Sequence, residues 1–295
     1  MKLLQFMKKD HTTLGVQTAY GICDLERTAA QFHSEVPTDM IALMESGSFG
    51  LNRIRELLEQ AEAFHKAAPF FWPASDVHFA PCVTHPEKIL CVGLNYKSHA
   101  AEAKMEVPET PVLFSKFNNA LASHGEQISI PKGAQKIDYE AELVVVMGRK
   151  ARDVAPDEAL SYVFGYTVGN DLSARELQFR TGQWLLGKSL DGFAPVGPYL
   201  VTADELANPD ELNIECRVNG GLRQSANTNE MIFNCATLIS YASQYMTLQP
   251  GDILFTGTPE GVIMGYPESE QVWLRPGDEI EVSIERIGTL KNWLR

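Results

Sequence analysis

Short apolar runs separated by glycine and proline dominate the chain from about residue 81 onward. They are rich in β-branched and aromatic residues and read ILCVG, PVLFSKF, ELVVVMG, VFGYTVG, ECRVNG, DILFTG and EIEVSIE. Runs of this length between turn-forming residues are typical of β-strands. The clearest helix in this part is predicted around Cys235 to Met246. Residues 81–295 are therefore predicted to form a domain dominated by β-structure.

The first 80 residues follow a different pattern. Residues 1 to about 20 are typical of a short strand pair, and a helix is predicted to begin at Thr38. A second helix is predicted near residues 50–67, because apolar residues recur there at spacings of three and four: Leu51, Ile54, Leu57, Leu58, Ala61 and Phe64. A stretch rich in proline and aromatic residues follows. We therefore expect a small N-terminal α/β module at residues 1–80.

Three acidic residues stand where predicted strands begin or end. Glu140 and Glu142 project from one face at the start of the strand that continues through Leu143 to Met147. Asp171 follows the apolar run 162–168. Adjacent carboxylates near a buried edge repel each other unless a cation neutralises them, although a solvated edge strand would also explain the pair. Because no cysteine or histidine lies nearby, a metal bound there would be Mg²⁺ or Mn²⁺.

The segment GLNYKSHAAEAK contains a candidate acid/base pair. If Ser98 to Lys104 form a helical turn, His99 and Glu102 lie on the same face and can hydrogen-bond. A carboxylate partner fixes the tautomer of an imidazole and supports proton transfer near neutral pH. The same spacing is also common on the polar surface of an ordinary short helix.

Basic and hydroxyl side chains near these segments are candidates for contact with an anionic substrate. Lys188 and Arg175 neighbour the acidic segments and could offset the charge of a carboxylate or an enolate, although a structural ion pair explains Arg175 at least as well. The loop TGTPEGV, with Thr258, offers hydroxyl and backbone N–H groups for a carboxylate, or forms an ordinary turn. Lys116 is a weaker candidate for the far end of the substrate.

Composition narrows the class of protein. The chain has 295 residues, 44% of them hydrophobic, so it can bury a large core. Its formal charge of -13 disfavours nucleic acid as a partner, because phosphate neutralisation needs lysine and arginine. The 5 cysteines form no CxxC pair, and neither a signal peptide nor a membrane-spanning segment is recognisable. We therefore expect a soluble, cytoplasmic protein that does not bind a membrane.

Five motifs occur in order: GLNYKSHAAE, DYEAELVVVMGR, GYTVGNDLSARELQ, GKSLDGFAPVGP and GDILFTGTPEGV. From Lys88 to Arg295 the chain resembles the fumarylacetoacetate hydrolase family, and the first motif resembles the lid segment of many members. The resemblance implies that the three acidic residues bind Mg²⁺ or Mn²⁺, that Lys188 reaches into the site beside the metal, and that Thr258 contacts the substrate carboxylate. Some members have arginine where this chain has Leu94, so that substrate contact is not carried over.

The resemblance also implies a fold and a reaction. The fold would be α+β and β-dominated, a mixed β-sandwich roll, usually in a homodimer. The reaction would be hydrolysis of a C–C bond in a small 1,3-diketo or 2-oxo acid, of the acylpyruvate or fumarylpyruvate type, with water activated by His99 and Glu102 and a metal-stabilised pyruvate enolate as leaving group. Oxaloacetate decarboxylation and isomerisation of a 2-hydroxyhepta-2,4-diene-1,7-dioate-type acid are alternatives. A catalytically silent metal and dicarboxylate sensor is a further one.

Overall fold

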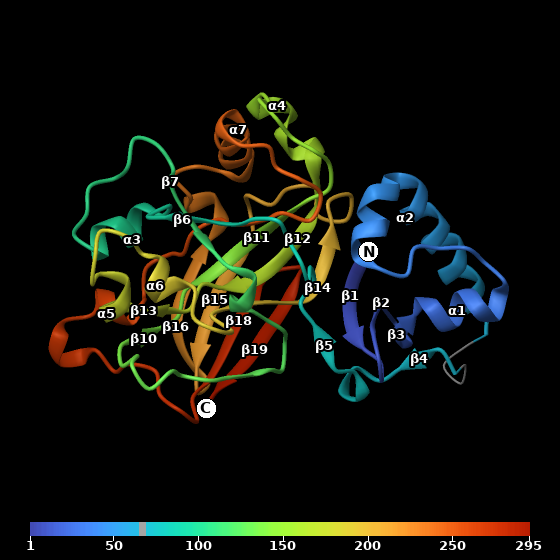
Figure 1. Ribbon diagram of the computed structural model, residues 1–295, viewed down its shortest axis with the longest axis horizontal. Coiled ribbons are helices and arrows are strands. Elements are labelled where there is room, and N and C mark those ends of the chain that lie inside the picture. The colour runs from blue at the N-terminus through green and yellow to red at the C-terminus, as the bar shows by residue number, and fades with distance from the viewer. Residues whose placement is uncertain (65–68) are drawn as a thin grey trace.

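The computed structural model describes residues 1–64 and 69–295 as a mixed, strand-rich α+β fold (Figure 1). The helices are α1 Leu25–Phe32, α2 Met40–Glu62, α3 Lys97–Glu102, α4 Pro156–Ala159, α5 Arg175–Gln178, α6 Leu185–Lys188 and α7 Cys235–Tyr245. The strands are β1 Lys2–Met7, β2 Thr12–Thr18, β3 Gly21–Asp24, β4 Phe71–Trp72, β5 Phe79–Ala80, β6 Ile89–Gly93, β7 Val112–Lys116, β8 Leu121–Ala122, β9 Gln127–Ile128, β10 Ile137–Asp138, β11 Ala141–Met147, β12 Val163–Asn170, β13 Ser173–Ala174, β14 Ala194–Thr202, β15 Asn213–Val218, β16 Gly221–Asn227, β17 Ile253–Phe255, β18 Glu279–Ile284 and β19 Gly288–Leu294.

Two large sheets carry the fold. The first runs in the order β4-β3-β2-β1-β14-β12-β11-β17-β6-β7, with β5 beside β1 and β8 beside β14. The second runs in the order β16-β15-β18-β19-β9, and β10 pairs separately with β13. Contacts of β11 with β15, β12 with β18 and β14 with β19 pack the two large sheets against each other. The predicted β-dominated sandwich is thereby confirmed.

Strand β11 shows how the sequence divides its side chains between two cores. Every residue from Ala141 to Met147 is buried. Leu143 and Val145 belong to the core between the two sheets, whereas Val144 and Val146 belong to the core shared with the N-terminal helices. Successive side chains of a strand point to opposite faces, so a strand covered on both sides needs a continuous apolar run. This run holds the beginning of β11, where two of the acidic residues lie, at the centre of the molecule.

The N-terminal residues extend the first sheet. Strands β1 and β2 form the predicted strand pair, and β1 also pairs with β14, where Leu3 lies opposite Leu200. Figure 1 shows this module in blue, with α1 and α2 beside its strands. Because one sheet runs through both parts of the chain, the predicted division near residue 80 is not marked by a break in the sheet, and it stays a prediction.

The two helices predicted between Thr38 and residue 67 are joined in α2. Asp39 caps its start by accepting a hydrogen bond from the Ala42 N–H, and Gly47 kinks it with φ 54° and ψ -136°. Such a conformation is open to glycine and costly for other residues, which explains why two separate helical patterns occur in the sequence. The helix ends at Glu62, earlier than predicted, and residues 65–67 of the prediction lie outside the described residues.

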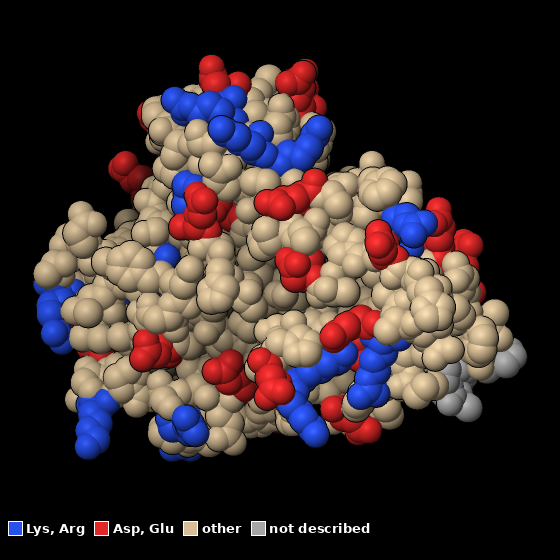
Figure 2. Space-filling model, turned by 45° about the vertical axis from the view of Figure 1, so that its right-hand side comes forward, with Lys and Arg blue, Asp and Glu red and all other residues tan. Residues whose placement is uncertain are grey.

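The seven predicted strand runs are found as β6, β7, β11, β12, β15, β17 and β18, and the helix predicted around Cys235 is α7. Acidic and basic side chains are interspersed on the face shown in Figure 2. Within residues 1–64 and 69–295, no helix is both long enough and apolar enough to cross a membrane.

Candidate active site

Three carboxylates converge where β11 begins and β12 ends. The antiparallel register places Ala141 opposite Asn170, and the Asp171 N–H donates to the Glu140 carbonyl oxygen at 2.9 Å. One ligand oxygen from each of Glu140, Glu142 and Asp171 lies within 4.8 Å of the other two, and all three residues are buried. The structure therefore brings together the three residues that the strand pattern predicted to be neighbours. We refer to them as the carboxylate cup.

Basic side chains neutralise two members of the cup. Lys188 Nζ lies 2.6 Å from Glu140 Oε2 and 2.9 Å from Asp171 Oδ2, and Arg175 Nη2 lies 2.7 Å from Glu140 Oε1. Burial alone would raise the pKa of Glu140, but the charges of Lys188 and Arg175 outweigh it and hold the pKa below its usual range. Burial likewise disfavours the charged form of Lys188, and its acidic neighbours outweigh this and raise its pKa. Glu140 and Lys188 are therefore both charged near neutral pH.

Glu142 differs because it forms no ion pair with any described residue. Its Oε2 accepts one hydrogen bond, from the Gly257 N–H at 2.7 Å. Burial, followed by the charges of Asp171 and Glu140, raises its pKa well above the usual value of 4.5. A buried carboxylate beside two others, without a cation of its own, is a donor set that fits a hard divalent cation. The cup therefore fits Mg²⁺ or Mn²⁺.

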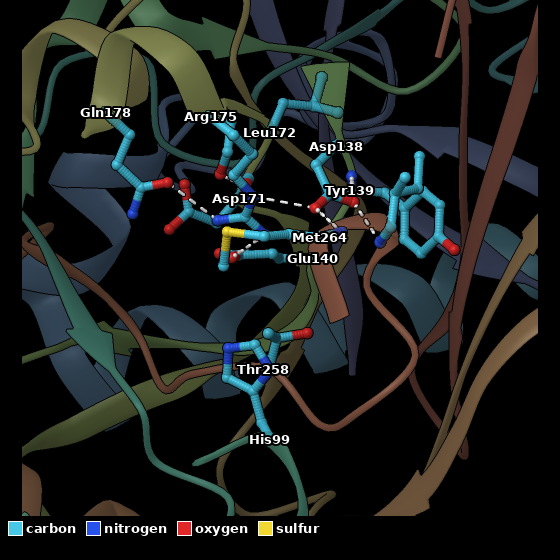
Figure 3. Close-up of polar contacts among 12 residues, drawn as sticks. His99, Asp138, Tyr139, Glu140, Asp171, Leu172, Arg175, Gln178, Thr258 and Met264 are labelled. Carbon is cyan, nitrogen blue, oxygen red and sulfur yellow. Dashed lines mark hydrogen bonds and ion pairs between the residues drawn. The ribbon is translucent and has the colours of Figure 1, made fainter. Parts of the chain in front are cut away.

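The cup opens into a small cavity of about 40 Å³. His99, Arg175, Lys188 and Thr258 line it together with Glu140 and Glu142. Its remaining wall is mainly apolar and aromatic, formed by residues such as Val92, Leu94, Met105, Phe114, Trp184 and Met264. Figure 3 shows Arg175 beside Asp171 and Glu140, with His99 and Thr258 on the opposite side. Basic side chains, acidic side chains and the candidate acid/base histidine thus line one cavity.

The predicted acid/base pair forms on α3. His99 Nδ1 lies 3.3 Å from Glu102 Oε2, and His99 is buried while it lines the cavity. Glu102 also accepts hydrogen bonds from the Gly261 N–H, at 3.0 Å to Oε1 and 3.2 Å to Oε2. A carboxylate on Nδ1 selects the tautomer in which that nitrogen carries the hydrogen, so that Nε2 has a free lone pair. The pair therefore has the arrangement of a general base and its orienting group.

Thr258 lines the cavity, but its hydroxyl already has partners. It donates to the Ala141 carbonyl oxygen at 2.9 Å and accepts from Gln224 Nε2 at 2.9 Å. A direct hydrogen bond to a substrate carboxylate would require the bond to Ala141 to break. The predicted role of Thr258 in binding substrate stays a prediction.

The structure corrects the role predicted for Lys116. Its side chain is fully buried, Nζ lies 2.5 Å from Asp171 Oδ1, and it donates to the carbonyl oxygens of Leu172 and Phe193 at 3.0 and 2.7 Å. Burial and the neighbouring Lys188 lower its pKa against the opposing effect of Asp171. With all donors directed at protein atoms, Lys116 supports the cup and does not reach the far end of a substrate.

Two residues that the sequence analysis did not single out complete the network. Asp138 is buried and accepts from Arg175 Nε at 2.9 Å, while Arg175 Nη1 donates to Gln178 Oε1 at 3.0 Å (Figure 3). Arg175 therefore has the structural ion pairs considered as its alternative role, and it also lines the cavity. Gln178, three residues along α5, could have been found from its i, i+3 spacing. Asp138 contacts residues distant in sequence, and no local pattern indicates this.

Comparisons with known proteins identify the family. The family model described as fumarylacetoacetate (FAA) hydrolase C-terminal matches residues 88–295. The mitochondrial oxaloacetate tautomerase Fahd2a of Rattus norvegicus is 40% identical over 297 residues, covering 99% of this chain and 91% of that protein.

Two solved structures are similar over 100% of this chain. Fumarylacetoacetate hydrolase of Exiguobacterium antarcticum is 33% identical, with a TM-score of 0.80, and the similarity covers 99% of its chain. Maleylpyruvate hydrolase of a Sphingobium species, in complex with manganese(II) and pyruvate, is 30% identical with a TM-score of 0.78 over 98% of its chain.

These relatives correct one expectation and establish another. The expected cytoplasmic location is contradicted, because the rat relative is named as a mitochondrial protein. The composition and scattered cysteines on which that expectation depended do not distinguish the two compartments. The predicted family is confirmed by the matched model and by relatives that share 30% or more of their residues over nearly the whole chain. The chain belongs to the fumarylacetoacetate hydrolase family.

Proposed function

We propose that the protein is a Mg²⁺- or Mn²⁺-dependent tautomerase of oxaloacetate or a closely similar 2-oxo diacid. The observation that carries this proposal is that His99, oriented by Glu102, lines the same cavity as Glu140 and Glu142. A tautomerase needs one group that moves a proton and a site that stabilises the enolate, and this cavity contains both. The similarity of nearly the whole chain to an oxaloacetate tautomerase supports the choice of reaction.

The reaction moves one proton and leaves the carbon skeleton intact. His99 Nε2 accepts a proton from the carbon next to the oxo group, and the electron pair of that C–H bond moves to give an enolate. The protonated imidazole then returns the proton to the enolate oxygen, which yields the enol, and the reverse sequence restores the oxo form. Glu102 stabilises the charged imidazole between the two transfers.

Other residues of the cavity would bind the diacid and stabilise its negative charge. A divalent ion held by Glu140, Glu142 and Asp171 would supply positive charge that stabilises the enolate. Arg175 and Lys188 line the same cavity and add positive charge at the carboxylates of the substrate. The apolar wall formed by residues such as Phe114 and Trp184 restricts the access of water to the enolate.

A second candidate is the C–C hydrolysis expected from the family resemblance. It is favoured by the similarity to maleylpyruvate hydrolase, which was solved with manganese(II) and pyruvate. The same His99 Nε2 could accept a proton from water, whose oxygen would attack the remote carbonyl carbon of an acylpyruvate. Collapse of that adduct would break the C–C bond, and pyruvate would leave as its enolate. Loss of CO₂ from oxaloacetate would produce the same enolate.

One panel of assays distinguishes these functions. Conversion of enol-oxaloacetate to its oxo form is followed by ultraviolet absorbance, and pyruvate release is measured from oxaloacetate, acetylpyruvate and fumarylpyruvate, each with Mn²⁺ and with EDTA. We expect Mn²⁺-dependent tautomerisation to be faster than any pyruvate release. Faster cleavage of an acylpyruvate would make the hydrolase the correct function. Tight Mn²⁺ binding without turnover of any substrate would indicate the sensor.

A further inference from the structure

The side chain of Glu102 lies directly against the backbone of Gly265. Gly265 ends a short 3-10 turn, Ile263–Gly265, in the loop after β17. A Cβ atom at position 265 would lie 2.0 Å from both the carboxyl carbon and Oε1 of Glu102, and 2.2 Å from its Cγ. These distances are far below van der Waals contact, so the carboxylate fills the space that any other residue at position 265 would need.

The same carboxylate is fixed at both of its oxygens. The Gly261 N–H donates to Oε1 and Oε2, and Oε2 is the partner of His99 Nδ1. The Glu102 side chain is only 14% exposed, so water replaces these bonds poorly. The position of Glu102, at the end of α3 and against this loop, therefore determines which ring nitrogen of His99 carries the hydrogen.

The loop itself is held from its other side. Asp138 accepts hydrogen bonds from the Ile263 N–H at 2.8 Å and the Met264 N–H at 3.1 Å. The Tyr139 hydroxyl donates to the Gly261 carbonyl oxygen at 2.8 Å. Asp138 and Tyr139 are both buried. If a side chain is added at Gly265, the loop cannot move away, whereas the end of the Glu102 side chain can rotate.

We propose that Gly265 is a positioning residue for the acid/base pair. Because position 265 has no side chain, the Glu102 carboxylate fits against its backbone, and from there it orients His99 toward the cavity. We call this space the seat of Glu102. This inference rests on the proposed function, because it assigns proton transfer to His99. It goes further in naming a residue that touches neither the substrate nor the carboxylate cup.

The test uses Gly265→Ala with Glu102→Ala, the double variant, and Gly133→Ala as a matched control. A Cβ at Gly133 would meet nothing within 4 Å, and Gly133 has no positive φ. The tautomer of His99 is read from the ¹⁵N chemical shifts of its ring, assigned with a His99→Gln sample. This measurement needs no turnover. Steady-state tautomerisation of oxaloacetate and Mn²⁺ affinity by titration calorimetry are measured on the same proteins.

We expect Gly265→Ala to lose the uniform Nδ1–H tautomer and to lower kcat by about ten- to a hundredfold, as removal of an orienting partner usually does. The Mn²⁺ affinity of Gly265→Ala should equal that of the wild type. The Gly133→Ala variant should match the wild type in the His99 tautomer, in kcat and in Mn²⁺ affinity. In the Glu102→Ala background the second substitution should have no further effect, because alanine at position 102 has no atoms in the seat.

The other possible results each contradict either the role of Gly265 or the proposed function, except where folding itself confirms the seat. A wild-type tautomer in Gly265→Ala, or additive losses in the double variant, would overturn the role of Gly265. If Gly265→Ala fails to fold but the double variant folds, the seat is confirmed through the relief of the clash. If neither folds, the clash is not with Glu102 and the inference is wrong. If the wild type converts no 2-oxo acid, the proposed function fails, while the ¹⁵N shifts still test the seat.

Discussion

Two of the three cup carboxylates differ from the third in what neutralises them. Asp171 has Lys116 at 2.5 Å and Lys188 at 2.9 Å, whereas Glu142 has no cationic partner among the residues that the structure describes. Removal of one member of a buried ion pair leaves the other charge unpaired, which costs about 3–5 kcal/mol. Removal of an unpaired charge carries no such cost. Asp171 and Glu142 should therefore respond differently to the same loss of charge.

We predict that Asp171→Ala loses Mn²⁺ affinity and also lowers the free energy of unfolding of the metal-free protein by about 3 kcal/mol or more. Glu142→Gln should lose Mn²⁺ affinity as well, but its metal-free form should be at least as stable as the wild type at pH 7. Titration calorimetry measures the affinity, and urea denaturation with EDTA measures the stability. Unchanged Mn²⁺ binding in either variant would exclude that residue as a ligand.

His99 is predicted to act on substrate without holding the metal. His99→Ala should lower kcat for tautomerisation by about 10²–10⁴, the usual contribution of a general base. Its Mn²⁺ affinity should remain within about twofold of the wild type, because the cup is unchanged. His85→Ala, at an exposed position, serves as the control. Activity close to that of the wild type in His99→Ala would remove this residue from the mechanism.

At the scale of elements, the close packing of α5 on α6 holds Lys188 in place. A Cβ at Gly187 would lie 2.3 Å from the Gln178 nitrogen and 2.6 Å from the Ala174 carbonyl oxygen. These are backbone atoms, which cannot rotate away as a side chain can. Any larger residue at position 187 must therefore move α6 away from α5, and Lys188 moves with it.

We predict that Gly187→Ala lowers the free energy of unfolding by about 1–3 kcal/mol, the usual cost of overpacking. Because Lys188 bridges Glu140 and Asp171, kcat should fall as well. Gly182→Ala is a matched control in the same connection, since a Cβ there would meet nothing within 4 Å. Urea denaturation and steady-state assays test both variants. Wild-type values for Gly187→Ala would show that α6 does not depend on this contact.

Elements with a strong local pattern could be predicted from the sequence. The continuous apolar run of β11 and the spacing of three between His99 and Glu102 are properties of neighbouring residues, and the structure contains both. The end of α2 was placed too late, because helix ends depend on caps that periodicity does not contain. Elements with such local patterns were therefore predictable, whereas their exact ends, and strands without a clear apolar run such as β16, were not.

Contacts between distant segments could not be predicted in this way. Lys116 was predicted as a weaker candidate for the far end of the substrate, but the fold buries it against Asp171, 55 residues further along the chain. The hydrogen bonds from Ile263 and Met264 to Asp138 are likewise non-local. The order of the motifs supports the family resemblance, but only the packed sheets show which side chains are in contact.

At the scale of the whole molecule, one sheet connects the N-terminal module to the site. The order β1-β14-β12-β11 leads from the module to the strands that carry the cup. Val144 and Val146 of β11 share a core with Leu43 and Met44 of α2. Unfolding of the module would expose this face of β11. Conditions that stabilise the cup should therefore raise the stability of the whole chain, and the pH dependence of Mn²⁺ stabilisation offers a test.

The raised pKa of Glu142 determines the direction of that pH dependence. Below its usual value of 4.5, Glu142 is protonated in both the folded and the unfolded chain. Between 4.5 and the raised pKa, the metal-free folded chain holds a proton that the unfolded chain has released, so the free energy of unfolding falls as pH rises. Mn²⁺ replaces this proton, so its affinity for the folded chain rises with pH in the same interval.

We therefore predict that the increase in Tm caused by saturating Mn²⁺ becomes larger as pH rises above 4.5. The free energy by which Mn²⁺ stabilises the folded chain should rise by about 1.4 kcal/mol per pH unit while Glu142 is still protonated in the metal-free protein. Glu142→Gln has no proton to lose at this position, so its pH profile in EDTA contains the contributions of all other groups, including Lys116, without that of Glu142. In Mn²⁺ this variant should show neither the increase in Tm nor its pH dependence, because it is expected to lose Mn²⁺ affinity. Calorimetric unfolding with Mn²⁺ and with EDTA measures both proteins. A Mn²⁺ effect that is independent of pH would mean that Glu142 is already ionised in the metal-free fold, and that Arg175 and Lys188 neutralise the cup as a whole.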